Sequence, residues 1–106
     1  MTKASDTANI LKQPFTNTLG TSNYRAGVNA GDTIASGGNY NVTIGDEAGT
    51  AITTGDNNTA VGYVAGDAVT TGTESAAFGS NALSANTEGT ANTALGASVS
   101  YTHLTL

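Results

Sequence analysis

The sequence predicts an all-β fold, a parallel β-solenoid or β-roll built from coils of about 17 residues. Three observations indicate this fold: a repeat at fixed spacing, short segments that alternate between β-branched and other residues, and glycines between those segments. The chain has 106 residues, enough for at most one domain, and only 10% of them are charged. Disordered chains of low hydrophobicity usually carry far more charge, so tight turns explain this composition better.

The repeat is clearest where an apolar residue precedes a glycine. Such pairs recur every 17 residues, at Ile44–Gly45, Val61–Gly62, Phe78–Gly79 and Leu95–Gly96. A polar column has the same spacing and consists of Asn41, Asn58, Ser75 and Asn92. An earlier copy that starts at Asn23 fits after an offset of 18 residues, with Gly38 as the extra residue. Agreement of several columns over three or more copies predicts a stack of equivalent coils.

Each repeat unit contains two segments that favour short strands. In one copy they are residues 42–44 and 51–53, each of which includes β-branched residues. The glycine columns between the segments predict turns with positive φ, where a side chain is sterically unfavourable. We therefore expect two short strands and two turns in each coil.

Stacking of equivalent coils at ~4.8 Å places equivalent residues in ladders. We expect the large apolar residues to form a ladder inside the coil, at Ile44, Val61, Phe78 and Leu95. The polar column is expected at a turn, where Asn41, Asn58 and Asn92 form hydrogen bonds along the stack. Each coil buries few large side chains, and the Ala and Thr columns permit close approach of chains. We therefore expect a homotrimer with a shared axial core.

The distribution of charge excludes nucleic acid as a partner of the repeat region. All three basic residues, Lys3, Lys12 and Arg25, lie in the first quarter of the chain, and the net charge is −5. Binding to phosphate requires clustered cations, and the same argument disfavours anionic membrane surfaces. No apolar run approaches the length of a membrane span, so no membrane insertion is expected. The absence of cysteine excludes disulfides and thiolate metal sites.

The polar residues do not form a catalytic or metal-binding pattern. Adjacent Asp46 and Glu47 would point to opposite sides of a strand, and later copies lack acids there, so no polysaccharide-cleaving pair is expected. Residues 56–58 offer oxygen ligands for Ca²⁺, but later copies lose the acidic character. The sole histidine, His103, lies outside the repeat. The sequence therefore predicts no enzyme, no metal and no cofactor, and Tyr40 and Tyr63 are candidates for glycan stacking.

The repeats resemble a known family. Residues 58–66, Asn-Thr-Ala-Val-Gly-Tyr-Val-Ala-Gly, and residues 92–96, Asn-Thr-Ala-Leu-Gly, resemble bacteriophage tail-fibre repeats. They are also similar to the head repeats of trimeric autotransporter (YadA-like) adhesins, but the 17-residue period is longer than the shortest of those repeats and favours the phage type. The resemblance covers residues 23–96 and implies a left-handed, trimeric β-roll that contacts a surface.

The sequence thus predicts a structural or adhesive segment of a phage tail fibre, located in the virion, that attaches to a host-surface glycan or acts as a spacer. The alternative is a trimeric adhesin head on a bacterial cell surface, and the start of the chain, which lacks an apolar signal core, favours the phage. Three parts are expected: a segment without repeats at 1–22, the solenoid at 23–99, and a tail at 100–106. The tail resembles translated adaptor sequence, and we expect it to add nothing to stability.

Overall fold

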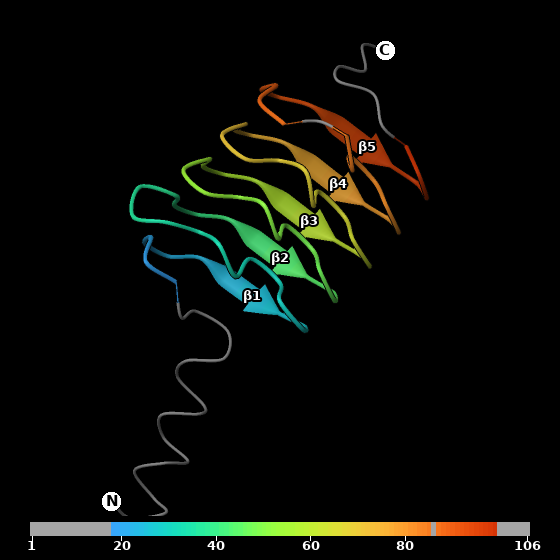
Figure 1. Ribbon diagram of the computed structural model, residues 1–106. Helices are drawn as coiled ribbons and strands as arrows, with labels where there is room; N and C mark the ends of the chain where they lie inside the picture. Colours follow the sequence, from blue (N-terminus) through green and yellow to red (C-terminus); the bar gives the residue numbers. More distant parts are fainter. Residues whose placement is uncertain (1–17, 86, 100–106) are drawn as a thin grey trace, which may run out of the picture.

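The computed structural model describes residues 18–85 and 87–99, and these residues form a parallel β-solenoid (Figure 1). All regular elements in these two ranges are strands of three residues. In order they are β1 (Tyr24–Ala26), β2 (Val42–Ile44), β3 (Thr59–Val61), β4 (Ala76–Phe78) and β5 (Thr93–Leu95). Each strand pairs in parallel with the next, so the spatial order equals the sequence order. The predicted fold class is confirmed.

The register of the strands confirms the predicted spacing. Tyr24 pairs with Val42, 18 residues later, whereas Val42 pairs with Thr59, 17 residues later. The extra residue of the first coil is not Gly38, as the sequence suggested. The Gly38 carbonyl accepts a hydrogen bond from Asn23 just as the Gly55 carbonyl accepts one from Asn41, so Gly38 holds a regular place. The insertion falls at residues 36–37, which are exposed.

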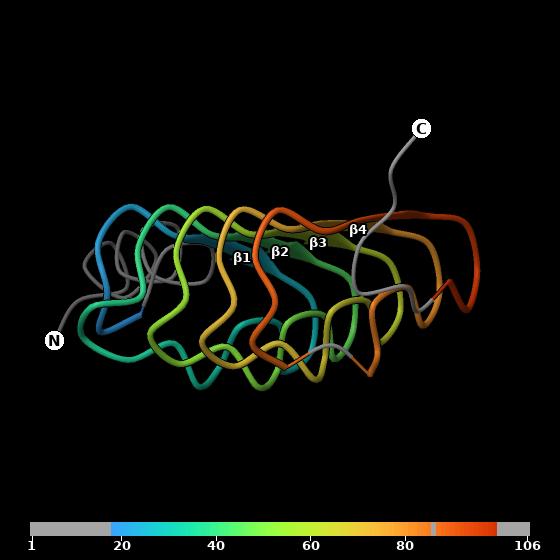
Figure 2. The same cartoon turned by 90° about the horizontal axis from the view of Figure 1, so that it is seen from above.

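Each coil contains one strand rather than the predicted two. The segment at 51–53 forms no strand, although it is still linked to its neighbours by single backbone hydrogen bonds, such as that from Thr53 N to Thr70 O at 3.0 Å. The strands therefore gather on one side of the coil, and turns form the opposite side (Figure 2). The prediction of a second strand was wrong because a β-branched side chain can fill the core of a tight coil even where the backbone is not extended.

The core of the solenoid is narrow and consists mainly of alanine. One buried cluster combines the middle residues of the last three strands with a second alanine column and Leu83; its members are Ala48, Ala60, Ala65, Ala77, Ala82, Leu83 and Ala94. A second cluster contains Ile34, Ile52 and Val69, which are at most 3% exposed. These larger side chains lie on the turn side of the coil, so the strand side can contribute only small residues.

The predicted inner ladder of large apolar residues lies on the outside. Ile44 is 38% exposed, Phe78 is 40% exposed and Leu95 is 76% exposed, while Val61 is half-buried. Successive residues of a strand point to opposite faces, and here the middle residue points inward. The predicted face was wrong because the alternation of residues divides a strand into two faces but does not show which of the two is buried.

The predicted asparagine ladder is confirmed at Asn41 and Asn58, and it is buried, whereas Asn92 Nδ2 has no hydrogen-bond partner among the described residues. The Oδ1 atom of Asn41 accepts a hydrogen bond from the backbone N–H of Asn58 at 2.9 Å, and Asn58 does the same for Ser75 at 3.1 Å. Each Nδ2 group donates to a glycine carbonyl on the next coil, from Asn41 to Gly55 and from Asn58 to Gly72, both at 2.8 Å. The ladder thus satisfies the buried backbone groups of one turn mostly through side chain-to-backbone bonds.

Candidate interaction surface

The outward-facing side of the sheet is the most distinctive surface of the described chain. Its two rows are the first and third residues of the strands. We call it the outer sheet face; its residues are Tyr24, Ala26, Val42, Ile44, Thr59, Val61, Ala76, Phe78, Thr93 and Leu95. The rows lie about 7 Å apart, the length of two strand residues, and neighbouring strands lie about 4.8 Å apart. The result is a flat patch, mostly apolar, without any charged side chain.

The local sequence places these side chains outward because the strand interior has no space for them. The middle positions of β2–β5 are Thr43, Ala60, Ala77 and Ala94, which are at most 3% exposed. With only three residues in each strand, two of every three side chains must then face outward. Soluble monomers usually keep polar residues on such a face, so the contiguous apolar patch is the candidate interaction surface of the described chain.

Two acidic residues, Asp46 and Asp56, lie outside the strands and accept hydrogen bonds from backbone N–H groups. Asp46 Oδ1 accepts a hydrogen bond from the Val28 N–H at 2.9 Å, and Asp56 Oδ1 accepts one from the Asn39 N–H at 2.8 Å. Each carboxylate links its coil to the preceding one. By sequence, Asp46 with Glu47 is a candidate catalytic pair and Asp56 a candidate Ca²⁺ ligand, and neither pattern recurs in later copies. In residues 18–85 and 87–99, no three acidic or histidine side chains gather in a group that could hold a metal ion.

The two tyrosines considered for glycan stacking are exposed but lie at opposite ends of the strands. Tyr40 is 58% exposed and precedes β2, whereas Tyr63 is 60% exposed and follows β3. They therefore do not form one aromatic platform, and each would offer a separate stacking position. Tyr24, at the start of β1, is also exposed, and sequence reasoning did not single it out.

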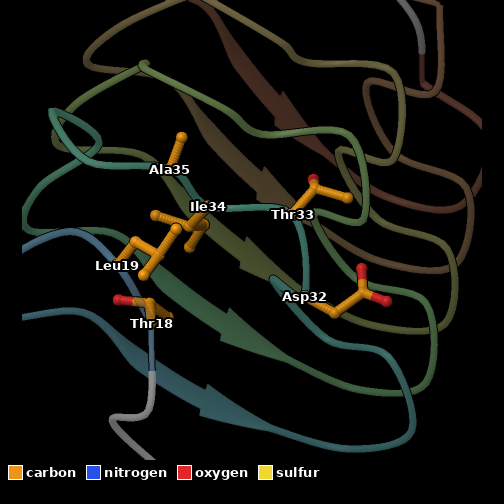
Figure 3. A pocket seen from close by; sticks show the side chains of 6 residues that line it. All are labelled: Thr18, Leu19, Asp32, Thr33, Ile34 and Ala35. Carbon is orange, nitrogen blue, oxygen red and sulfur yellow. The ribbon is translucent and has the colours of Figure 1, made fainter.

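A pocket of about 230 Å³ lies at the N-terminal end of the solenoid (Figure 3). It is lined by Thr18, Leu19, Asp32, Thr33, Ile34 and Ala35. In Figure 3, Leu19 and Ile34 lie side by side, while the Asp32 carboxylate points away from them. The lining does not combine converging polar groups with an apolar floor, the combination typical of ligand sites.

Within the described ranges, no helix is long and apolar enough to cross a bilayer.

Asp67 is the one described carboxyl group with a clear shift in its pKa. Burial raises the pKa of Asp67 above its ordinary value, a backbone hydrogen bond opposes the rise, and the charge of Glu47 adds to it. Its Oδ1 atom is buried and has no hydrogen-bond partner among the described residues. The folded chain thus holds the Asp67 proton to higher pH than the unfolded chain does.

We expect Asp67→Asn to be more stable than the natural chain at neutral pH by less than about 1 kcal/mol, since the group is only partly buried. A raised folded-state pKa contributes stability that is fully present below the unfolded value and is lost as pH rises through the folded value. The advantage of the variant should therefore vanish at acidic pH. Thermal melts of both proteins across that range provide the measurement, and a constant difference at all pH values would contradict it.

Comparison with known proteins identifies no relative of this chain. No protein-family model matches the sequence, and no curated protein or solved structure is similar to it. The fold defines the class: a tandem-repeat protein of the parallel β-solenoid type. Two features of the described chain stand out, an outer sheet face without charged side chains and a buried asparagine ladder.

Proposed function

We propose that this chain is a structural and adhesive repeat segment of a phage tail fibre, which assembles as a homotrimer and contacts a host-surface glycan without cleaving it. The outer sheet face is the observation that carries the assembly. The tail-fibre origin, and with it a location in the virion, rests on the resemblance of residues 58–66 and 92–96 to fibre repeats. The alternative, a trimeric adhesin head at a bacterial cell surface, uses the same assembly.

The outer sheet face supports assembly for an energetic reason. A row that contains Ile44, Val61 and Phe78 leaves apolar area in water, and burial of that area is favourable at about 25 cal/mol per Å². The alanine core contributes little apolar burial per coil, so a second layer of packing would add a large share of the stability. In a homotrimer each chain contributes the same apolar row, and the small residues Ala76 and Thr59 beside that row permit close approach of the chains.

The trimer is tested by light scattering with Phe78→Asp as the disrupting variant. Phe78 lies inside the apolar row, between Val61 and Leu95, so a charge there should separate the chains, whereas Thr71→Asp alters an exposed residue outside the strands. We expect a mass of three chains for the natural protein and for Thr71→Asp, and of one chain for Phe78→Asp. A natural chain that is a stable folded monomer would contradict the proposed assembly.

Adhesion is tested by a glycan array with the natural protein, followed by product analysis of each bound glycan. Three chains multiply weak polar contacts, so we expect binding without change of the glycan. Tyr40→Ala and Tyr63→Ala should act independently, because the two tyrosines lie at opposite ends of the strands. Release of shortened oligosaccharides, abolished by Asp46→Asn, would overturn the non-enzymatic part of the proposal. Absence of binding would favour a spacer.

A further inference from the structure

Two columns of exposed side chains flank the sheet. The leading column stands two residues before each strand, and the trailing column stands two residues after it. Within one chain, the width of the sheet separates the two columns, so no residue of one column lies beside a residue of the other. The leading column consists of Ser22, Tyr40, Asn57, Glu74 and Ala91, and the trailing column of Val28, Asp46, Tyr63, Ser80 and Ala97.

Backbone hydrogen bonds between coils hold both columns in place. In the leading column, the Tyr40 N–H donates to the Thr21 carbonyl of the preceding coil at 3.0 Å. Beside the trailing column, the Asn81 N–H donates to the Tyr63 carbonyl at 2.9 Å. The backbone around both tyrosines is therefore fixed before a ligand arrives, which lowers the entropic cost of binding.

The proposed homotrimer brings the two columns together. A closed trimer has a three-fold axis, and all three outer sheet faces are covered along their whole length only if this axis runs along the stack of coils. Rotation about that axis preserves the direction of the strands, so the end of each strand adjoins the start of the equivalent strand in the next chain. The trailing column of one chain then lies beside the leading column of the next, coil by coil. We call this junction the chain seam.

We propose that the chain seam is a binding site for uncharged glycans that two copies of the chain share. On the coil of β3, Tyr63 of one chain lies opposite Asn57 of the next, and on the coil of β2, Asp46 lies opposite Tyr40. In each pair, an aromatic ring suited to stacking on a sugar faces a polar side chain suited to binding its hydroxyl groups. Neither pair forms within one chain, so the site rests on the proposed trimer.

The charges at the chain seam favour uncharged sugars over acidic ones. Asp46 from one chain and Glu74 from the next are exposed there, and neither column contains a lysine or an arginine. Asp46 Oδ1 accepts a hydrogen bond from the Val28 N–H at 2.9 Å, and a carboxylate has further acceptor positions for sugar hydroxyls. A sugar that carries its own carboxylate would be repelled by these two groups.

The test uses two variants that each remove one side of the same pair, Tyr63→Ala and Asn57→Gly. Glycine suits the φ of 58° at Asn57, so the turn is preserved. The probes are neutral hexose oligosaccharides and their sialylated counterparts on one array. We expect the natural trimer to bind neutral probes more tightly than sialylated ones, and each variant trimer to bind the neutral probes about tenfold more weakly.

Mixed trimers distinguish a shared site from a site within one chain. The two variants are unfolded together in equal amounts and refolded, and native mass spectrometry counts the mixed trimers. About one seam in four then carries both natural residues, because each side of a seam is natural in half of the chains. We expect this fraction of sites to regain natural affinity in calorimetry. A mixture of Tyr63→Ala with the double variant Tyr63→Ala/Asn57→Gly should regain none.

Light scattering on each sample separates the failure of this inference from the failure of the trimer. A natural chain that is monomeric would overturn both. If trimers form and the mixture regains no sites of natural affinity, the shared site is wrong and the proposed trimer is retained. Tighter binding of the sialylated probes, or binding of neither kind of probe, would overturn the shared site as well.

Discussion

Replacement of Gly62 by alanine is expected to destabilise the solenoid by about 3–5 kcal/mol, nearly as much as replacement by valine. The φ of Gly62 is 131°, a conformation that side chains rarely adopt. An added Cβ would lie 2.8 Å from both the carbonyl carbon and the oxygen of Gly79 on the next coil. The first carbon of any side chain meets backbone, so a small side chain cannot relieve the contact. A loss of this size is a large share of the stability of a small domain.

Two control variants separate the causes of this loss. Gly96→Ala has the same strained φ without the backbone contact, so it should cost only about 1–3 kcal/mol. Thr59→Val retains a residue suited to a strand on the outer sheet face and should change stability by less than about 0.5 kcal/mol. Thermal and urea melts of the natural chain, Gly62→Ala, Gly96→Ala and Thr59→Val give the order of their stabilities. If Thr59→Val were the most destabilising, the assigned positions of strand and turn would be wrong.

Asn58→Ala is expected to destabilise the chain by about 3–5 kcal/mol, because it leaves two buried backbone groups without partners. Asn58 Nδ2 donates to the Gly72 carbonyl at 2.8 Å, and Asn58 Oδ1 accepts from the Ser75 N–H at 3.1 Å. Asn58→Asp should be similarly harmful, since a carboxylate can accept but cannot donate to Gly72, and its charge would be buried. Denaturant melts measure the loss.

Ser75→Asn is the matched variant, and it should raise the stability of the chain instead of lowering it. Ser75 stands in the asparagine column, but its hydroxyl makes only a 3.4 Å contact with the Thr73 carbonyl. An asparagine there would let Oδ1 accept from the Asn92 N–H, as Asn58 Oδ1 accepts from Ser75, and should add about 1 kcal/mol. A loss of stability in Ser75→Asn, or an unchanged melt of Asn58→Ala, would show that the ladder is not a main source of stability.

The sequence predicted correctly those features that depend on the spacing of residues. Asn41, Asn58 and Asn92 recur at one period, and a repeated polar residue in a stack can be satisfied only by its copies or their backbone. Gly62 and Gly79 recur in the same way, and both have the positive φ that the repeat predicted. The candidate surface was only partly predictable. Ile44, Val61, Phe78 and Leu95 were identified as one ladder, but on the wrong side of the strand.

Leu83 shows a second limit of the repeat pattern. It stands where earlier coils have Gly31, Gly49 and Gly66, shares their positive φ, and is fully buried in the alanine cluster. A change of residue type in a column indicates only that something differs. Whether a leucine can fill the interior there depends on the space left by neighbouring coils, which only the packed structure contains.

By itself, the sequence determined the period, the parallel stacking, the asparagine ladder and the positive-φ glycines that follow the strands, because all of these follow from equivalence between copies. The positive φ expected of the other glycine column is wrong at Gly55 and Gly72. Only the tertiary structure decided which strand face is covered and how many strands each coil has. Both depend on the width of the coil. Ile34, Ile52 and Val69 occupy the interior from the turn side, so the middle positions of β2–β5 admit only Thr43 and alanines. The larger residues of the strands then face outward.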